Sequence, residues 1–330
     1  MNVPSDAGAA RLRCSGERLG HPIALLGLLL VVGFIISLRT NTFLQLDNLM
    51  SILRAFSWIA VAAFGEALVL IIGGIDVSVG AVMALAGTIS AMTLGWQASV
   101  PLAVAFGLAA AAAVGFINGW LTSVFKLPSF VLTLATMSVV RGFVFGLTRG
   151  WPVRDLPVAY RILGQADARI GAWPVPAPVL IMLGLALLVA LLLHRTVLGR
   201  YIYALGRSEP ALRASGVDVI RVRWVVYVMG SLLAGIGGIM MTARLGVASP
   251  TAASGYELDV IAAAIIGGAS LFGGQGDVLG VMLGTLLMQV LRSSVVLLDF
   301  PVYWQQVAMG LLVLAAILVD WWRHRALREP

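Results

Sequence analysis

The chain has 330 residues, of which 60% are hydrophobic and only 11% are charged, and its formal net charge is +7. Soluble domains carry about a quarter charged residues, so this composition excludes an ordinary soluble protein and indicates a polytopic membrane protein. The positive charge does not predict nucleic-acid binding, because the arginines flank apolar segments and form neither a basic face nor a stacking platform.

Apolar segments long enough to span a bilayer recur along the chain and predict an all-α membrane protein with about ten transmembrane helices. We expect residues 1–21 to form an N-terminal cytoplasmic tail, residues 22–320 to form one transmembrane domain, and residues 321–330 to form a C-terminal cytoplasmic tail. The first span, residues 22–38, has no small-x-small cleavage site before Arg39, so we interpret it as an uncleaved helix rather than a secretion signal.

Glu66 lies near the middle of the second span, which we place at residues 55–72. A carboxylate at membrane depth is costly unless it is paired, protonated or facing water. Glu66 either lines a solute path, where it hydrogen-bonds a polyol, or ties two helices together. We favour the helix tie, because polar contacts between membrane helices are common.

The segment Gly73-Gly74-Ile75-Asp76-Val77-Ser78-Val79-Gly80 separates two apolar runs. Paired glycines break a helix at little cost, and Asp76 or Ser78 can accept hydrogen bonds from the amides of a helix that restarts. Such a break at membrane depth is tolerated where it lines a cavity or is covered by protein. The segment therefore predicts an interrupted helix or a tight turn between two spans.

Small residues recur at four-residue spacing in three of the later spans. Stripes of this kind let helix backbones approach closely in lipid, where hydrophobicity cannot drive association. The stripes are Gly107, Ala111, Gly115 and Gly119; then Gly230, Ala234 and Gly238; and then Gly276, Gly280 and Gly284.

Residues 195–223 form a polar segment with repeated arginines between two apolar runs. Short loops dense in arginine stay in the cytoplasm, so we expect this loop and both tails on the inner side. Within the loop, Ser208 can cap a helix, Glu209 suits the positive end of its dipole, and Pro210 fits its first turn. Gly216 supplies a stop, which predicts a short exposed helix.

A second glycine-rich stretch follows the acids Glu257 and Asp259, which favour the first turn of a helix. It contains the pairs Gly267-Gly268 and Gly273-Gly274, and this density predicts a tight crossing or another interrupted helix. The similarity of Ile265-Ile266-Gly267-Gly268 to Ile71-Ile72-Gly73-Gly74 suggests a duplicated plan, as transporter repeats often leave.

Three of these segments resemble known motifs. Residues 203–217, YALGRSEPALRASGV, are similar to the coupling loop of bacterial ABC importer permeases of the ribose/xylose/galactose branch. Residues 73–80, GGIDVSVG, resemble the family's GGIDLSVG signature with Val77 in place of leucine, and the stretch from Glu257 to Gly276 resembles ELDxIAAxxIGGxSLxGGxG. The resemblance covers nearly all of residues 22–320 and implies a fold like that of type II ABC importers.

The resemblance implies the permease subunit of an importer that moves a pentose or hexose across the bacterial inner membrane. Its partners would be a separate ATPase subunit that binds ATP and Mg, a periplasmic sugar-binding protein, and a second permease copy, identical or paralogous. The positions implied for ATPase coupling are Gly206, Ser208, Glu209, Ala211, Leu212, Arg213, Ser215 and Gly216. The positions we assign to a translocation path or gate are Glu66, Gly73, Gly74, Asp76, Ser78, Gly267, Gly268, Gly273 and Gly274.

The sequence contains no Gly-x-x-x-x-Gly-Lys-Ser/Thr phosphate-binding loop, so we expect no ATP binding of that kind by the chain itself. We also expect no catalytic residues and no bound cofactor. We expect no metal site either, since the one cysteine, Cys14, has no companion ligands. Two alternatives remain. The chain could be an ion-coupled secondary transporter with Glu66 and Asp76 as coupling acids, or an ABC permease for an autoinducer sugar, a nucleoside or a branched-chain amino acid.

Overall fold

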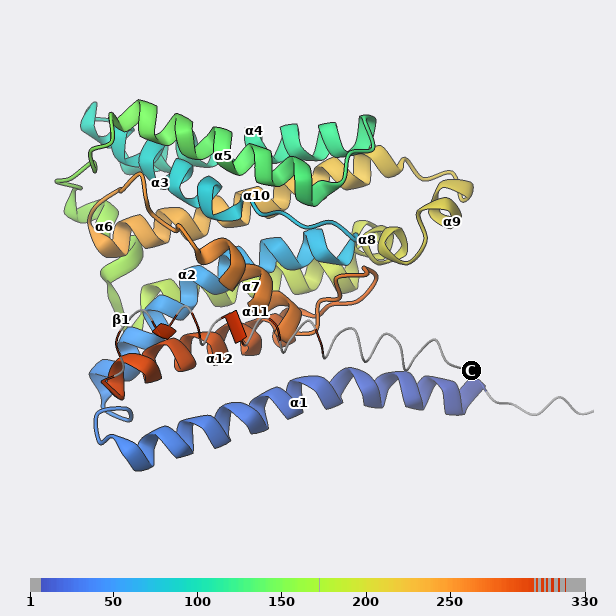
Figure 1. Ribbon diagram of the computed structural model, residues 1–330, viewed down its shortest axis with the longest axis horizontal. Helices are drawn as coiled ribbons and strands as arrows, with labels where there is room; N and C mark the ends of the chain where they lie inside the picture. Colours follow the sequence, from blue (N-terminus) through green and yellow to red (C-terminus); the bar gives the residue numbers. More distant parts are fainter. Residues whose placement is uncertain are drawn as a thin grey trace, which may run out of the picture.

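The computed structural model describes residues 7–171 and 173–299, together with residues 301, 304, 305, 307, 310, 311, 314 and 318. The described chain is a bundle of long helices that run alongside one another (Figure 1). The helices are α1 (Ala7–Arg39), α2 (Leu46–Ile71), α3 (Val79–Gly95), α4 (Val100–Val124), α5 (Ser129–Thr148), α6 (Val158–Gln165), α7 (Ala177–Arg195), α8 (Val197–Arg207), α9 (Glu209–Ala214), α10 (Val219–Leu245), α11 (Tyr256–Ile266) and α12 (Val278–Leu297). An antiparallel hairpin joins β1 (Asp167–Ile170) to β2 (Trp173–Pro176).

The prediction of an all-α membrane fold is confirmed, apart from this small hairpin. Among the described residues, seven helices are long and apolar enough to cross a membrane: α1, α2, α4, α5, α7, α10 and α12. The predicted number of about ten spans is not confirmed. The last part of the predicted transmembrane domain, residues 303–320, lies mostly outside the described residues, and the predicted tail at residues 321–330 lies wholly outside them.

One predicted span agrees with the structure and another differs at its start. The helix α1 begins at Ala7, but its stretch long and apolar enough to cross a membrane is His21–Arg39, which matches the first span predicted at residues 22–38. The second span was expected to begin near residue 55, but α2 begins at Leu46 and continues without a break to Ile71. Polar side chains near the start of α2 interrupt the apolar pattern, although the backbone stays helical through them.

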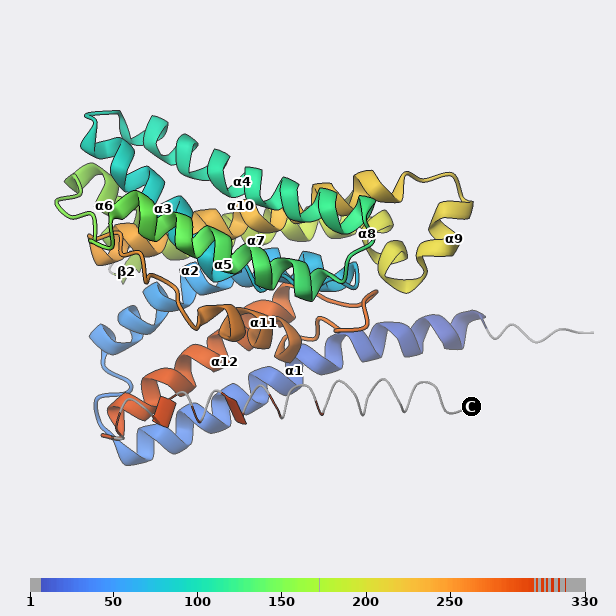
Figure 2. The same cartoon turned by 45° about the horizontal axis from the view of Figure 1, so that its top comes forward.

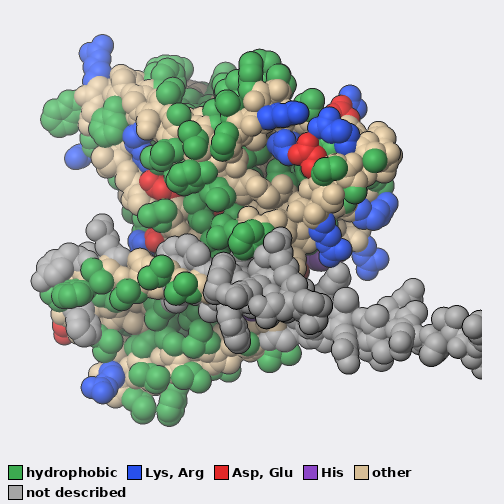
Figure 3. Space-filling view, turned by 45° about the vertical axis from the view of Figure 1, so that its right-hand side comes forward, with side chains coloured by type: hydrophobic (Ala, Val, Ile, Leu, Met, Phe, Trp, Pro, Cys, Tyr) green, Lys and Arg blue, Asp and Glu red, His purple; other side chains and the backbone are tan. Residues whose placement is uncertain are grey.

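The two ends of the bundle differ in what they carry. We call them the α9 end, where α8, α9 and the start of α1 lie, and the α6 end, where α6 and the hairpin lie (Figure 1). Figure 2 shows α1 at one side of the bundle, alongside α12. In the view of Figure 3, hydrophobic side chains cover much of the bundle, and arginines and acids gather toward one end.

The helices α2 and α10 form the centre of the bundle and are mostly buried, whereas α1 and α5 expose most of their apolar residues. The small-residue stripes bring backbones together as predicted. A Cβ at Gly115 of α4 would lie 2.6 Å from the carbonyl oxygen of Tyr227 in α10, and one at Gly107 would lie 2.6 Å from that of Ala86 in α3. Only glycine allows these approaches, which is the close packing that membrane helices use.

Both glycine-rich stretches interrupt the helical pattern, as predicted. After α2, residues 72–78 return along the bundle in non-helical conformation before α3 begins part-way along it (Figure 1). The helix α11 has 11 residues, or about 16 Å, and is too short to cross a hydrocarbon core of about 30 Å. The starts of α3 and α11 meet, because a Cβ at Gly80 would lie 2.7 Å from the carbonyl oxygen of Ala253.

Candidate functional site

The short helix predicted in the arginine-rich loop is present as α9. Ser208 Oγ accepts a hydrogen bond from the backbone nitrogen of Ala211 at 3.3 Å, and Pro210 lies in the first turn. Gly216 follows the helix with a φ of 83°, a conformation that favours glycine. The local capping chemistry of the sequence therefore determines where this helix begins and ends.

The helix α9 has one buried and one exposed face. Leu212 is buried against the bundle, whereas the remaining predicted coupling positions of the helix and its flanks are mainly exposed: Ser208, Ala211, Arg213, Ser215 and Gly216. This arrangement anchors α9 through an apolar side chain and leaves small and polar residues free to contact another molecule.

Glu209 connects α9 to α10. Its Oε2 accepts a hydrogen bond from Arg223 at 2.7 Å, and its Oε1 accepts one from Arg213 at 2.8 Å. The hydrogen bond from Arg213, and then the bond and charge of Arg223, lower the pKa of Glu209, although partial burial acts in the opposite direction. Because Arg223 lies near the start of α10, this ion pair couples the position of α9 to that of α10.

A second contact joins the coupling region to both glycine-rich stretches. We call it the glycine junction, formed by Ile71, Gly73, Gly206, Gly273 and Gly274. The backbone nitrogen of Gly274 donates to the carbonyl oxygen of Ile71 at 2.8 Å. A Cβ at Gly206 in α8 would overlap both of these atoms, and a Cβ at Gly273 would lie 2.8 Å from the carbonyl oxygen of Gly206. The structure thus brings together glycines that are about two hundred residues apart.

Glu66 and Asp76 belong to a different, buried group of polar side chains. Glu66 Oε1 accepts a hydrogen bond from the Asp76 backbone nitrogen at 3.1 Å, and Asp76 Oδ1 accepts from the Ser78 nitrogen at 2.8 Å. The network continues through Asn118, which donates to Ser78 Oγ, and Thr136, which donates to Asn118 Oδ1. Glu66 is 2% exposed and Asp76 is 4% exposed. Glu66 bonds to the segment that follows its own helix, so its role as a tie between two helices stays a prediction.

The non-helical segment between α2 and α3 is also held by α5. The backbone nitrogen of Ile75 donates to Ser129 Oγ and that of Val77 donates to Thr133 Oγ1, both at 3.1 Å. Thr133 Oγ1 donates in turn to the carbonyl oxygen of Ile75. These hydroxyls satisfy backbone groups that the break leaves free. Ser129 and Thr133 were not predicted to have this role, although their i, i+4 spacing places both on one face of α5.

Gly267 and Gly268 lie apart from the glycine junction. A Cβ at Gly267 would lie 2.5 Å from the backbone nitrogen of Val281 in α12, and one at Gly268 would lie 2.8 Å from the ring of His21 in α1. His21 Nε2 donates to the carbonyl oxygen of Ile266 at 2.9 Å. The residues that we assigned to a path or gate therefore occupy four places: the junction, the Glu66 network, this packing contact, and the position of Gly74, where a Cβ would lie 2.7 Å from the Tyr227 hydroxyl.

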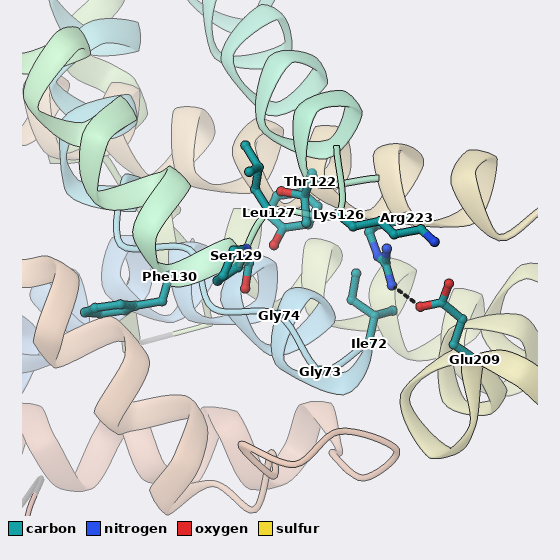
Figure 4. Close-up of a pocket in the computed structure, with 12 residues that line it drawn as sticks. Ile72, Gly73, Gly74, Thr122, Lys126, Leu127, Ser129, Phe130, Glu209 and Arg223 are labelled. Carbon is teal, nitrogen blue, oxygen red and sulfur yellow. Dashed lines mark hydrogen bonds and ion pairs between the residues drawn. The ribbon is translucent and has the colours of Figure 1, made fainter. Parts of the chain in front are cut away.

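A cavity of about 510 Å³ lies beside the junction, at the α9 end (Figure 4). Its walls come from the end of α2, the turn between α4 and α5, α9 and the first part of α10. The lining residues are Ile72, Gly73, Gly74, Thr122, Lys126, Leu127, Pro128, Ser129, Phe130, Glu209, Arg223 and Tyr227. Thr122 and Tyr227 were not predicted as site residues, because each is a single polar group inside an apolar span.

The groups at this site are suited to contacts between helices and turns and to their relative movement. Within the described part of the chain, no group of three or more histidine, cysteine, aspartate or glutamate side chains could hold a metal ion. The site instead joins an exposed helix, two glycine-rich turns and a cavity through backbone contacts and through the ion pair of Glu209 with Arg223, whose side chains are 35% and 18% exposed.

Comparison with known proteins gives consistent matches. Residues 48–317 match the family described as branched-chain amino acid transport system / permease component. The chain is 39% identical to the ribose import permease protein RbsC of Escherichia coli (strain K12) over 305 residues, which cover 90% of this chain and 92% of that protein. It is 30% identical to the xylose transport system permease protein XylH of the same strain over 380 residues, covering 97% and 96%.

A third relative is the probable ABC transporter permease protein YphD of Escherichia coli (strain K12), 36% identical over 303 residues, with 91% of this chain and 89% of that protein covered. No solved structure matches the chain. The family match covers most of the chain, and these relatives match it almost from end to end. The chain therefore belongs to this family of transport-system permease components.

Proposed function

We propose that the chain is the transmembrane permease subunit of a bacterial ABC importer, and that it translocates a monosaccharide, a pentose or a hexose. The observation that carries this proposal is the near full-length similarity to permeases named for ribose and for xylose. The exposed helix α9, in a loop that resembles an importer coupling loop, supports the same function.

A separate ATPase subunit supplies the energy and binds ATP and Mg, and it contacts the exposed face of α9. Movement of α9 reaches α10 through the ion pair between Glu209 and Arg223. Movement of α8, which adjoins α9, reaches both glycine-rich turns through Gly206. A ligand shifts a conformational equilibrium only through contacts that differ between states, and these two connections are routes by which the ATPase can act on the bundle.

In this scheme the α9 end and both termini lie in the cytoplasm, because exposed arginines gather in the loop of α8 and α9. A periplasmic sugar-binding protein delivers the solute to the α6 end. A second permease copy, identical or paralogous, completes the path in the inner membrane. The large apolar surface of α5 is available for contact with lipid or with that copy.

The alternative of an ion-coupled secondary transporter gives the central role to Glu66 and Asp76. In the structure both carboxyl groups are buried and hydrogen-bonded to the backbone of the same chain. Neither lines the cavity at the α9 end, so no observation favours this alternative over the importer.

Reconstitution separates the two functions. Proteoliposomes would contain the permease with its ATPase, the binding protein outside, and radiolabelled ribose or xylose. We expect uptake that requires the ATPase and internal ATP and that persists when a proton uncoupler is added. Uptake by the permease chain alone, driven by a pH gradient and abolished by the uncoupler, would contradict the proposal.

A further inference from the structure

We propose that the cavity of about 510 Å³ at the α9 end is a binding site for the transported solute, a neutral monosaccharide that occupies it before release. Binding of solute in this cavity also changes the energy of the coupling helix α9. This inference rests on the function proposed above, and it adds a location and a set of residues that the sequence motifs do not identify.

The size of the cavity fits a small ligand. Small-molecule sites in proteins commonly have volumes of about 300–1,000 Å³, and this cavity lies in the lower part of that range. The base of the cavity is formed by Gly73 and Gly74. Their backbone nitrogens donate hydrogen bonds to carbonyl oxygens of α2, which fixes the turn. No atom lies within 4 Å of a Cβ built at Gly73, so the backbone there faces open space.

Thr122 gives the strongest indication that the cavity holds a ligand. It is only 6% exposed, it lines the cavity, and its Oγ1 has no hydrogen-bond partner among the described residues. A buried hydroxyl without a partner is destabilising compared with an apolar group of the same shape, so fold stability does not explain its presence. The oxygen itself is buried within the cavity wall, and a rotation of the Thr122 side chain toward the cavity would let a ligand hydroxyl supply the missing partner.

Two further residues with hydroxyl groups, Ser129 and Tyr227, line the same cavity. Tyr227 is fully buried, and its hydroxyl lies against Gly74 and has no hydrogen-bond partner among the described residues. Hydroxyl groups both donate and accept hydrogen bonds, as do the hydroxyls of a sugar. Thr122, Ser129 and Tyr227 therefore present the chemistry that recognises a polyol.

The charges of the lining favour a neutral ligand over an anion. The guanidinium of Arg223 is paired with Glu209, at 2.7 Å. Figure 4 shows Lys126 extending away from Ser129 and Gly74. The cations of the lining are thus either neutralised or directed elsewhere, and the groups left for a ligand are hydroxyls and backbone.

The walls of the cavity belong to the same elements that connect α9 to the bundle. One wall carries the ion pair between Glu209 and Arg223, and the base is the Gly73-Gly74 turn beside the glycine junction. A sugar bound there contacts both connections at once. Occupancy therefore changes the energy of the coupling helix, which provides a route from solute to ATP hydrolysis.

The first test compares two isosteric substitutions. Thr122→Val removes the proposed ligand contact without breaking a hydrogen bond within the protein. Thr88→Val is the matched control, because Thr88 is also fully buried and its Oγ1 also lacks a partner among the described residues, but it does not line the cavity. Neither variant should lower the melting temperature.

In the reconstituted importer we expect Thr122→Val to reduce the rate of ribose or xylose uptake at low sugar concentration by about three- to tenfold, the effect of one lost hydrogen bond. Solute-stimulated ATP hydrolysis should fall in parallel, whereas Thr88→Val should leave both unchanged. Equal uptake by Thr122→Val, Thr88→Val and the unsubstituted protein would overturn the proposal.

A second test detects occupancy directly in the purified full-length chain. In a Cys14→Ser background, Leu127→Cys places a thiol on the cavity wall, and Arg221→Cys places one on an exposed position nearby that does not line it. We expect ribose or xylose to slow maleimide labelling at position 127 and not at position 221. Unprotected labelling alongside ATPase-dependent uptake would overturn this site and leave the proposed function standing.

Discussion

At the scale of single residues, Gly206 shows how tightly the coupling region is built. Its Cα lies so close to the backbone of Ile71 and Gly274 that a methyl group does not fit. Both neighbouring atoms are backbone atoms joined to each other by a hydrogen bond, so they cannot move aside as a flexible side chain would. The position therefore demands glycine for reasons of contact, in a helix where glycine is otherwise unfavourable.

We predict that Gly206→Ala separates α8 from the glycine junction and abolishes solute-stimulated ATP hydrolysis, with a lower melting temperature. Gly184→Ala in α7 is the matched control, because no atom lies within 4 Å of a Cβ at Gly184. Replacing an open helical glycine by alanine stabilises a helix by about 0.4–1 kcal/mol. Normal coupling in Gly206→Ala would show that the junction does not transmit movement.

Glu209 gives a prediction about pH. The pKa of Glu209 is lowered in the folded protein from its ordinary value of 4.5. Its ion pairs therefore contribute their full stability at pH values above the pKa of the unfolded chain. This contribution is lost as the pH falls through the lower pKa of the folded protein. The stability difference between the unsubstituted protein and Glu209→Gln should therefore be constant from about pH 5 to 8 and disappear in stronger acid.

The expected difference is small, about 0.2–1 kcal/mol, because the Glu209 side chain is partly exposed and such pairs are screened by water. Thermal unfolding in detergent at a series of pH values measures it. Asp155→Asn, which removes an exposed acid at the α6 end, should show no such pattern. A difference that grows below pH 4.5 would contradict the assignment of Glu209 as the acid of this ion pair.

At the scale of elements, hydroxyls of α5 are one of the groups that hold the break between α2 and α3. Thr133→Val removes the acceptor for the Val77 backbone nitrogen and the donor to the Ile75 carbonyl oxygen. Leaving a buried amide unpaired costs about 1–3 kcal/mol. We expect a lower melting temperature and reduced uptake, measured on the purified and reconstituted protein.

Ser138→Ala provides the control on the same helix, because Ser138 is exposed and its hydroxyl bonds only within α5. It should leave both quantities unchanged. If Thr133→Val were as stable as Ser138→Ala, the hydrogen bonds from α5 would not be what holds the interrupted segment.

The elements differ in how well the sequence predicts them. The start and end of α9 follow from Ser208, Pro210 and Gly216, because capping depends on residues a few positions apart. The close packing of α4 follows from its small-residue stripe for a similar reason. The junction of Gly206 with Gly73 and Gly273 could not be predicted, since nothing local indicates which distant backbones approach each other.

The Thr122 cavity was missed for a related reason. A single threonine or serine in an apolar span commonly bonds to its own helix, as Thr133 and Ser123 do. Only the structure shows that the Thr122 hydroxyl makes no such bond and that the residue lines a cavity. The number of spans could not be predicted from the sequence either, because α11 is a short apolar helix. Hydropathy alone does not distinguish such a helix from one that crosses the whole membrane.

At the scale of the whole molecule, the proposed mechanism requires the α9 end to face the cytoplasm. The loop of α8 and α9 carries exposed arginines, including Arg207 and Arg213, which the positive-inside tendency places there. The α6 end would then face the periplasm, with Trp151 exposed at the end of α5. An ATPase can contact α9 only in this orientation.

Two single-cysteine variants in a Cys14→Ser background test the orientation: Arg213→Cys in α9 and Trp151→Cys after α5. A membrane-impermeant maleimide should label Trp151→Cys in intact spheroplasts, and Arg213→Cys only in inside-out vesicles or after the membrane is permeabilised. Both variants should label equally in detergent, which shows that each thiol is accessible. Labelling of Arg213→Cys from outside intact spheroplasts would place α9 beyond the reach of any cytoplasmic ATPase, and the importer mechanism would then be wrong even though the fold and the family would stand.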